Sequence, residues 1–279
     1  MKKCFVFLLI SFVYVPRLLA DDGAFNAYGN TIFPLHETVV QLKKEKLDLV
    51  KKGDTLYVNI YFEFYNPGPE KELLVGFVTP PAWNGMLSMN ERNHPQIKEF
   101  TVNVNGSDLS YEVYRIDSSG FKIHDSTVRG NDFIYSFKTK FPHGKSIIKH
   151  SYSYLCGSGV YIDKSFYYRL TTGTLWANHE IEDFELNINM GKDVNFFLPY
   201  SFNRTKTNWR VVGVGKLSVD SISVDPERFF AGPAMRMAYM RSGYIQYKER
   251  HFKPANDLFF GIFASEIEFR KPGKIKRQK

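Results

Sequence analysis

The sequence is poor in cysteine, with only Cys4 and Cys156 among 279 residues. Cys4 lies in an apolar stretch at the N-terminus that we expect to be removed, which would leave Cys156 alone. A single cysteine cannot form an intramolecular disulfide. We therefore expect packing and hydrogen bonds to hold this fold, even in a compartment that permits disulfides.

Long hydrophobic runs are also missing. The apolar run Cys4–Val15 is shorter than the roughly 20 residues that span a bilayer, and no later stretch comes closer. It follows Met1-Lys2-Lys3 and precedes Leu18-Leu19-Ala20, which is the pattern of a secretory signal peptide. We expect cleavage at or near Ala20, export to the periplasm or beyond, and no transmembrane segment afterwards. The alternative is an uncleaved anchor, against which Pro16 and Arg17 argue.

The body of the chain lacks the basic excess that its formal charge of +8 suggests. Residues 1–20 carry three cations and residues 270–279 carry six, with no acid in either segment, so residues 21–269 have a net charge of −1. A nucleic-acid-binding domain should carry a basic face on the fold itself, so we expect no nucleic-acid partner. The basic tail at 270–279 is expected to be disordered, or else to touch an anionic lipid, glycan or nucleic acid.

Helix signals are sparse, whereas strand signals recur along the chain. The sequence has 25 Phe and 17 Tyr, which favour strands. From Leu56 to Phe64 apolar residues alternate with Tyr57, Asn59, Tyr61 and Glu63, a period of two that indicates a strand with one buried face. Similar segments recur at 73–78, 100–104, 133–141, 148–154, 166–170, 184–190, 194–198, 211–224 and 258–269, with a more charged one at 38–50. We predict an all-β protein of one or two β-sandwich-like units with one or two short helices.

Turn residues punctuate these strands. Lys51–Asp54 predicts a hairpin connection, and Asn105-Gly106 predicts a second hairpin whose loop Ser107-Asp108 would lengthen. Asn66–Pro69 suits a type II turn, with Gly68 supplying the positive φ. Short helices are expected at Asp225–Glu227 and Pro233–Met240.

Polar clusters near residues 117–130 suggest a domain boundary. We therefore expect a signal peptide at 1–20, an N-terminal β-sandwich-like domain at 21–120, a second β-rich domain at 121–269 and the tail at 270–279.

No catalytic, metal or cofactor motif is evident. Cys156 precedes Gly157-Ser158-Gly159, but nothing in the sequence brings a base to its thiol, so a half-buried residue at a strand end is the better interpretation. His179–Asp183 lacks the second histidine or further oxygen ligands that would hold a metal. Glu63 and Glu99 could pair for glycoside hydrolysis, although no positive reason selects them. We assign no catalytic residue, no metal site and no cofactor.

Trp83 and Trp176 are weak candidates for a binding site, because both fall in loop-like contexts. An exposed Trp could stack on a sugar or anchor a partner. The alternative is a buried Trp that plugs the end of a sandwich, which is the commoner arrangement.

A family resemblance adds to this interpretation. It rests on Asp22-Gly23-Ala24, Pro34–Thr38, Glu63–Gly68, Leu74–Phe77 and His94–Val102. These segments resemble an uncharacterised family of exported bacterial proteins, some of which carry a C-terminal YARHG domain. This chain has no Tyr-Ala-Arg-His-Gly motif, so that domain is absent. The resemblance implies an extracytoplasmic β protein and carries over no catalytic residue.

Three functional hypotheses follow. The first is a non-enzymatic binding or accessory module of the cell envelope that meets a protein or glycan through loops or an open strand edge. The second is a hydrolase of cell-wall or extracellular polymers, which requires reactive groups gathered in a reachable pocket. The third is a purely structural module.

Overall fold

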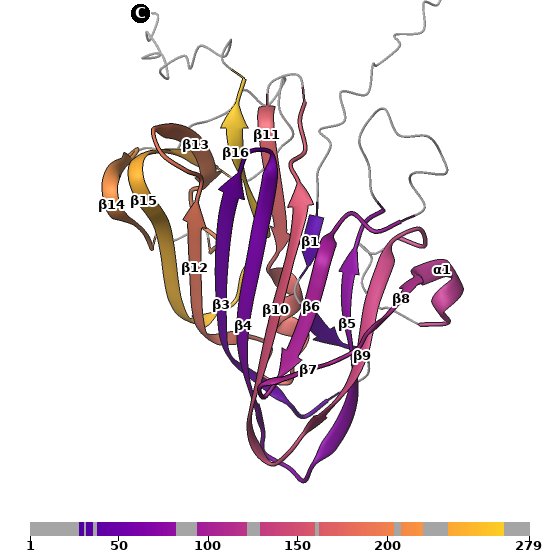
Figure 1. Ribbon diagram of the computed structural model, residues 1–279. Coiled ribbons are helices and arrows are strands. Elements are labelled where there is room, and N and C mark those ends of the chain that lie inside the picture. The colour runs from indigo at the N-terminus through magenta and orange to yellow at the C-terminus, as the bar shows by residue number, and fades with distance from the viewer. Residues whose placement is uncertain are drawn as a thin grey trace, which may run out of the picture.

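The protein is built almost entirely from strands, as the sequence predicts (Figure 1). This computed structural model describes residues 28–30, 32–35, 38–81, 94–121, 129–159, 162–203, 208–219 and 234–264. The strands of the first half are β1 (Tyr28–Asn30), β2 (Ile32–Pro34), β3 (Gln41–Lys52), β4 (Thr55–Asn66), β5 (Lys71–Thr79), β6 (Lys98–Val104), β7 (Ser107–Asp108) and β8 (Glu112–Arg115). Those of the second half are β9 (Phe133–Phe141), β10 (Gly144–Leu155), β11 (Ile162–Arg169), β12 (Ile181–Asn189), β13 (Val194–Pro199), β14 (Trp209–Leu217), β15 (Met235–Phe252) and β16 (Leu258–Phe263).

Two sheets contain all of these strands. The large sheet has twelve strands in the order β1-β11-β16-β13-β15-β12-β3-β4-β10-β6-β7, and β14 joins it by pairing with β15. The small sheet has the order β2-β5-β9-β8. In Figure 1, β14 and β15 lie at the left of the molecule and the small sheet at the right. Two short helical segments, α1 (Ile116–Ser119) and η1 (Thr171–Leu175), complete the described chain.

The large sheet folds over itself at β15, which is 18 residues long. Residues 235–240 of β15 pair with β13, and residues 245–252 pair with β12. Strand β14 pairs with residues 238–247, so it occupies one edge of β15 while β13 and β12 share the other. One strand thus serves two layers, and such corners form at bends and bulges.

Two facing glycines make this corner possible. Gly213 of β14 pairs with Gly243 of β15, and their φ angles are +119° and +96°. A Cβ at Gly243 would overlap the carbonyl oxygen of Val212, and one at Gly213 would overlap that of Ser242. Only glycine allows both the positive φ and this close approach of the two backbones.

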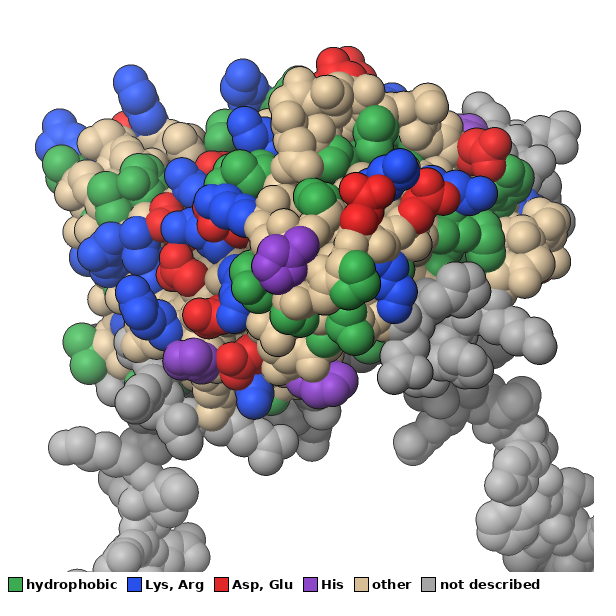
Figure 2. All heavy atoms as spheres, turned by 90° about the horizontal axis from the view of Figure 1, so that it is seen from below, with side chains coloured by type: hydrophobic (Ala, Val, Ile, Leu, Met, Phe, Trp, Pro, Cys, Tyr) green, Lys and Arg blue, Asp and Glu red, His purple; other side chains and the backbone are tan. Residues whose placement is uncertain are grey.

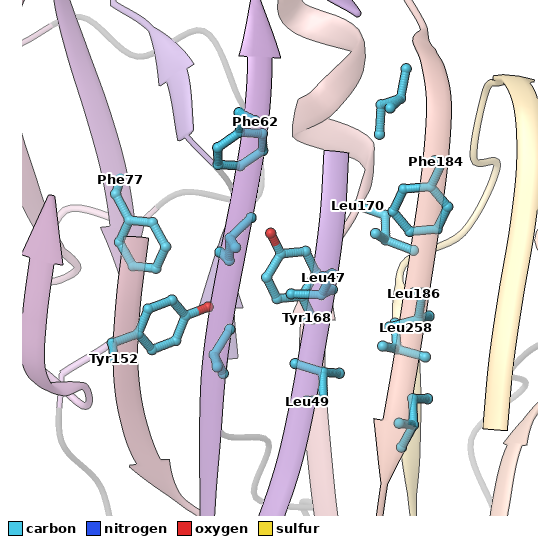
Figure 3. Close-up of a cluster of buried hydrophobic side chains, with 14 of the residues drawn as sticks. Leu47, Leu49, Phe62, Phe77, Tyr152, Tyr168, Leu170, Phe184, Leu186 and Leu258 are labelled. Atoms are coloured by element: carbon cyan, nitrogen blue, oxygen red, sulfur yellow. The ribbon is translucent and has the colours of Figure 1, made fainter. Parts of the chain in front are cut away.

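The core lies on one face of the large sheet, between its own folded layers and beneath the small sheet. The ring of Phe77, from β5, is 5.0 Å from that of Tyr152 in β10, which joins the small sheet to the large one (Figure 3). The ring of Tyr154 in β10 is 6.3 Å from that of Phe166 in β11, which joins the two layers of the large sheet. The prediction of an all-β, sandwich-like fold is confirmed.

The strands on the two sides of the expected domain boundary pair with each other. β4 pairs with β10 over twelve residues, and β5 pairs with β9 over nine. Pairing therefore does not follow a division between 21–120 and 121–269, because each sheet draws strands from both segments. The polar segment near 117–130, which suggested a boundary, begins within the short helix α1.

The turn predictions have mixed outcomes. Both hairpins are confirmed, but Asn105-Gly106 alone forms the second loop, with φ of 51° and 93°, and Ser107–Asp108 is strand β7 rather than loop. The type II turn is wrong, because Gly68 is not among the residues with positive φ. The Asn66 side chain instead organises this turn: its Oδ1 accepts the Gly68 N–H, and its Nδ2 donates to the carbonyls of Pro69 and Phe141.

The short helix expected at 233–240 is also wrong. From Met235 onward this segment is the first part of β15, where it pairs with both β13 and β14. Pairing on both edges outweighs the weak helix signal of a proline followed by Ala and Met. The signal peptide, the tail at 270–279, Trp83 and the expected helix at 225–227 lie outside the described residues.

Candidate functional site

A carboxyl group lies in the middle of the apolar core. Glu45 of β3 is fully buried, and its Oε1 accepts a hydrogen bond of 3.1 Å from Tyr168 Oη of β11. Its Oε2 has no hydrogen-bond partner. Burial raises the pKa of Glu45 to about 8, although the bond from Tyr168 lowers it somewhat. Glu45 is therefore mostly protonated at neutral pH.

Two further polar side chains of this interior come from β10. The Nδ1 of His150 bonds to the carbonyl of Thr101, while its Nε2 is buried without a partner. Burial lowers the pKa of His150 to about 4, so this imidazole is neutral. The hydroxyl of Tyr152 is also buried without a partner. Glu45 and His150 are 0% and 3% exposed, so a substrate at the surface would not reach them.

Sequence reasoning missed this buried carboxyl, although a signal for it exists. Glu45 is separated from Leu47 and Leu49 by steps of two residues, so all three share the inner face of β3. A bulge between Leu42 and Lys44 sets this alternation. Most residues of β3 are charged, so the alternation of buried residues along it was not evident from the sequence.

Within the described ranges, the other sequence candidates for chemistry, Cys156, Glu63 and Glu99, are not assembled into a reactive site. Burial raises the pKa of the Cys156 thiol, the opposite of what activates a nucleophile. Glu63 of β4 is paired with Ile147 of β10. Glu99 of β6 is adjacent to Lys98, which is paired with Ser153 of β10. The six residue steps from 147 to 153 span about 20 Å along β10, too far for a carboxylate pair in hydrolysis.

The acidic segment 179–183 is engaged in ion pairs. Glu180 pairs with Lys253 and is hydrogen-bonded to His251 Nδ1, Glu182 pairs with Lys43, and Asp183 pairs with Lys44. Within the described residues, no three His, Cys, Asp or Glu side chains gather closely enough to hold a metal.

Trp176, one of the two weak binding candidates, lies in the core. It is 0% exposed, and its ring is 4.4 Å from that of Phe64 and 6.1 Å from that of Phe141. Its faces are covered by phenylalanine, so in this structure it offers no platform for a sugar or a partner. Of the two interpretations of Trp176, the structure shows the buried one.

The outer face of the large sheet is polar and internally paired. Lys46 lies between Asp48 and Glu185, and Lys248 pairs with Glu185 at 2.6 Å. Gln246 and Asn187 add side-chain hydrogen bonds between β15 and β12. Figure 2 shows interleaved blue and red side chains on the left, the side on which β14 and β15 lie in Figure 1. Charges that satisfy one another in this way leave little to attract a charged ligand.

Strand β14 differs from this face. It pairs with β15 on one edge, and no strand of the described ranges pairs with its other edge. The residues from Val211 to Gly215 are uncharged, and Val214 is 57% exposed. Natural edge strands are usually blunted by Lys, Pro or strong bulges. Here a bulge after Val214 is the one such device within the central stretch.

A pattern on β14 distinguishes its outer face. Trp209 is buried, and Val211 and Leu217 pack against the core. Side chains alternate along the strand, so the even-numbered residues share the opposite, outer face. These are Arg210, Val212, Val214 and Lys216. Two valines are thus flanked by two cations. The sequence contained this pattern, but that β14 is an edge strand emerges only from the topology.

Comparisons with known proteins bear on the fold. No protein-family model and no curated protein matches this chain. Among solved structures, the chain is similar to a proposed nutrient-binding protein from Legionella pneumophila subsp. pneumophila. The TM-score is 0.56 at 20% identity, and the match covers 84% of this chain and 71% of that one. The similarity establishes a shared β fold and no more. No helix within the described ranges is long and apolar enough to cross a membrane.

Proposed function

We propose that this chain is an exported, non-enzymatic binding module of the cell envelope, and that it engages its partner through the free edge of β14. The observation that carries the proposal is the nine-residue edge strand with an uncharged centre and an exposed Val214. Unpaired backbone groups along such an edge are a template for strand addition by a partner.

Three other observations support this function. The acid and the histidine with the largest pKa shifts, Glu45 and His150, are enclosed in the core rather than open to substrate. The structural neighbour from Legionella is itself a proposed nutrient-binding protein. Export accords with the basic and apolar pattern of residues 1–20 and with the resemblance to an exported family.

Site-specific photo-cross-linking in intact cells tests the proposal. A photoreactive amino acid at Val214 should give one dominant adduct, to be identified by mass spectrometry. The matched control carries the same group at Asn59, an exposed position on the outer face of β4. Identical adducts from both positions, or only bulk envelope proteins from Val214, would refute the proposal.

A further inference from the structure

The side chains around the free edge of β14 restrict what can pair with it. On the outer face, Arg210 and Lys216 lie six residues apart, with Val212 and Val214 between them. A strand added beside β14 places its own side chains next to these, residue for residue and on the same face. Valine favours an apolar cross-strand neighbour, whereas Arg and Lys favour an acidic one.

The charge of the wider ribbon strengthens this preference. Residues 208–219 and 234–248 include five cations and no Asp or Glu. Three of these cations already have partners within the fold: Arg210 donates to Gln246, Arg236 to the carbonyl of Ser218, and Lys248 pairs with Glu185. Lys216 and Arg241 are exposed, and neither forms a salt bridge with a carboxylate of the described residues. The ribbon therefore presents a positive edge to an incoming strand.

In the register centred on Gly213, a second copy of this chain fits the same edge poorly. If two β14 strands paired antiparallel about Gly213, Val212 would face Val214, but Arg210 would face Lys216 at both ends. Like charges directly opposite each other on a sheet destabilise the pairing. The same two positions that disfavour self-pairing favour an acidic strand.

We infer that β14 accepts, by strand addition, an extended segment of a partner protein with the pattern acidic–x–apolar–x–apolar–x–acidic. This inference rests on the proposed function and specifies the chemistry of its partner. The pattern reads the same in both directions, so charge alone does not decide between parallel and antiparallel addition. Backbone hydrogen bonds supply affinity in this mode, and the alternate side chains supply specificity.

Fluorescence anisotropy with synthetic peptides tests the inference on the purified chain. The probe is Thr-Glu-Thr-Val-Thr-Val-Thr-Glu-Thr, and the control peptide has Lys in place of both Glu residues. We expect the acidic peptide to bind and the basic one to bind at least about tenfold more weakly, a difference that shrinks as salt is added. Equal affinities would overturn the inference.

A charge swap locates the binding site. Lys216→Glu should weaken binding of the acidic peptide about three- to tenfold. A peptide in which Lys replaces only one of the two Glu residues should then bind the variant about as well as the acidic peptide binds the unsubstituted chain. The end that restores binding gives the direction of the added strand. The matched control is Lys98→Glu, an exposed charge reversal on β6 near the other end of the large sheet. Equal losses in the two variants would mean a non-specific charge effect and would overturn the inference.

Backbone N-methylation tests the mode of binding. A strand added to an edge bonds through alternate residues, so N-methylation of one alternate set should abolish binding and N-methylation of the other should be tolerated. Tolerance of both sets would overturn strand addition. Sedimentation of the chain alone tests self-pairing: a dimer lost in Val214→Lys would assign the edge to a second copy.

The outcomes separate this inference from the proposed function. A specific adduct from Val214 in cells, with no binding of the acidic peptide, would refute the acidic pattern and leave the binding module standing. Peptide binding that survives Lys216→Glu unchanged would place the peptide elsewhere on the surface.

Discussion

The buried carboxyl of Glu45 should make the stability of this protein fall as the pH rises above neutrality. The pKa of Glu45 is about 8 in the folded protein and near 4.5 in an ordinary environment. Between these values the folded state holds a proton that the unfolded state releases. The free energy of unfolding then decreases by about 1.4 kcal/mol per pH unit.

His150 acts in the opposite direction over part of this range. Its pKa is about 4 when folded and 6.5 ordinarily, so between these values the unfolded state binds the extra proton. Its contribution to stability is complete above pH 6.5 and is lost as the pH falls through about 4. The two slopes are equal and opposite between about pH 4.5 and 6.5, where these two groups together give a plateau. From pH 6.5 to 8 Glu45 acts alone and removes about 2 kcal/mol.

Urea unfolding at pH 6.5, 7.0, 7.5 and 8.0, followed by tryptophan fluorescence, measures this decline. Glu45→Gln keeps an oxygen that can accept the Tyr168 hydrogen bond and removes the titration, so its stability should stay level. The gap between the two proteins should therefore widen by about 2 kcal/mol across the series. Glu72→Gln, at an exposed position of β5, is the matched control and should run parallel to the unsubstituted protein. Parallel curves for Glu45→Gln as well would refute the reasoning.

Three further predictions concern the core and the corner. His150→Phe should remove the plateau, so that the free energy of unfolding already decreases as the pH rises above about 4.5. Urea denaturation of this variant at pH 5 and pH 6.5 checks this, and equal stabilities at the two pH values would contradict it. Gly243→Ala should destabilise the protein by about 1–3 kcal/mol or more and lower the midpoint of thermal unfolding. The control Gly53→Ala, at a position that also has a positive φ but open space around a Cβ, should lower the midpoint less. Trp176→Ala should destabilise the protein by about 3–5 kcal/mol in urea, and a loss below about 1 kcal/mol would show that the ring is not part of the core.

The sequence alone predicted most of the local features of this fold. The alternation from Leu56 to Phe64 is the inner face of β4, and the hairpins at Gly53 and at Asn105-Gly106 are confirmed. These features depend on neighbours in the chain, where side-chain alternation and backbone φ preferences act directly. The turn at Gly68 departed from prediction because the Asn66 side chain bonds to Phe141, a residue 75 positions away.

The sequence by itself determined the strand character of the chain and the inner and outer faces of most strands. Only the tertiary structure decided which strands are neighbours, and three features depend on that choice. The pKa of Glu45 is raised because the folded layers bury its carboxyl between β3 and β11. Trp176 is buried because Phe64 and Phe141 meet around it. β14 is an edge because no strand of the described ranges pairs with its far side. Pairing between distant segments is set by the sum of many weak contacts, and no short stretch of sequence carries that sum.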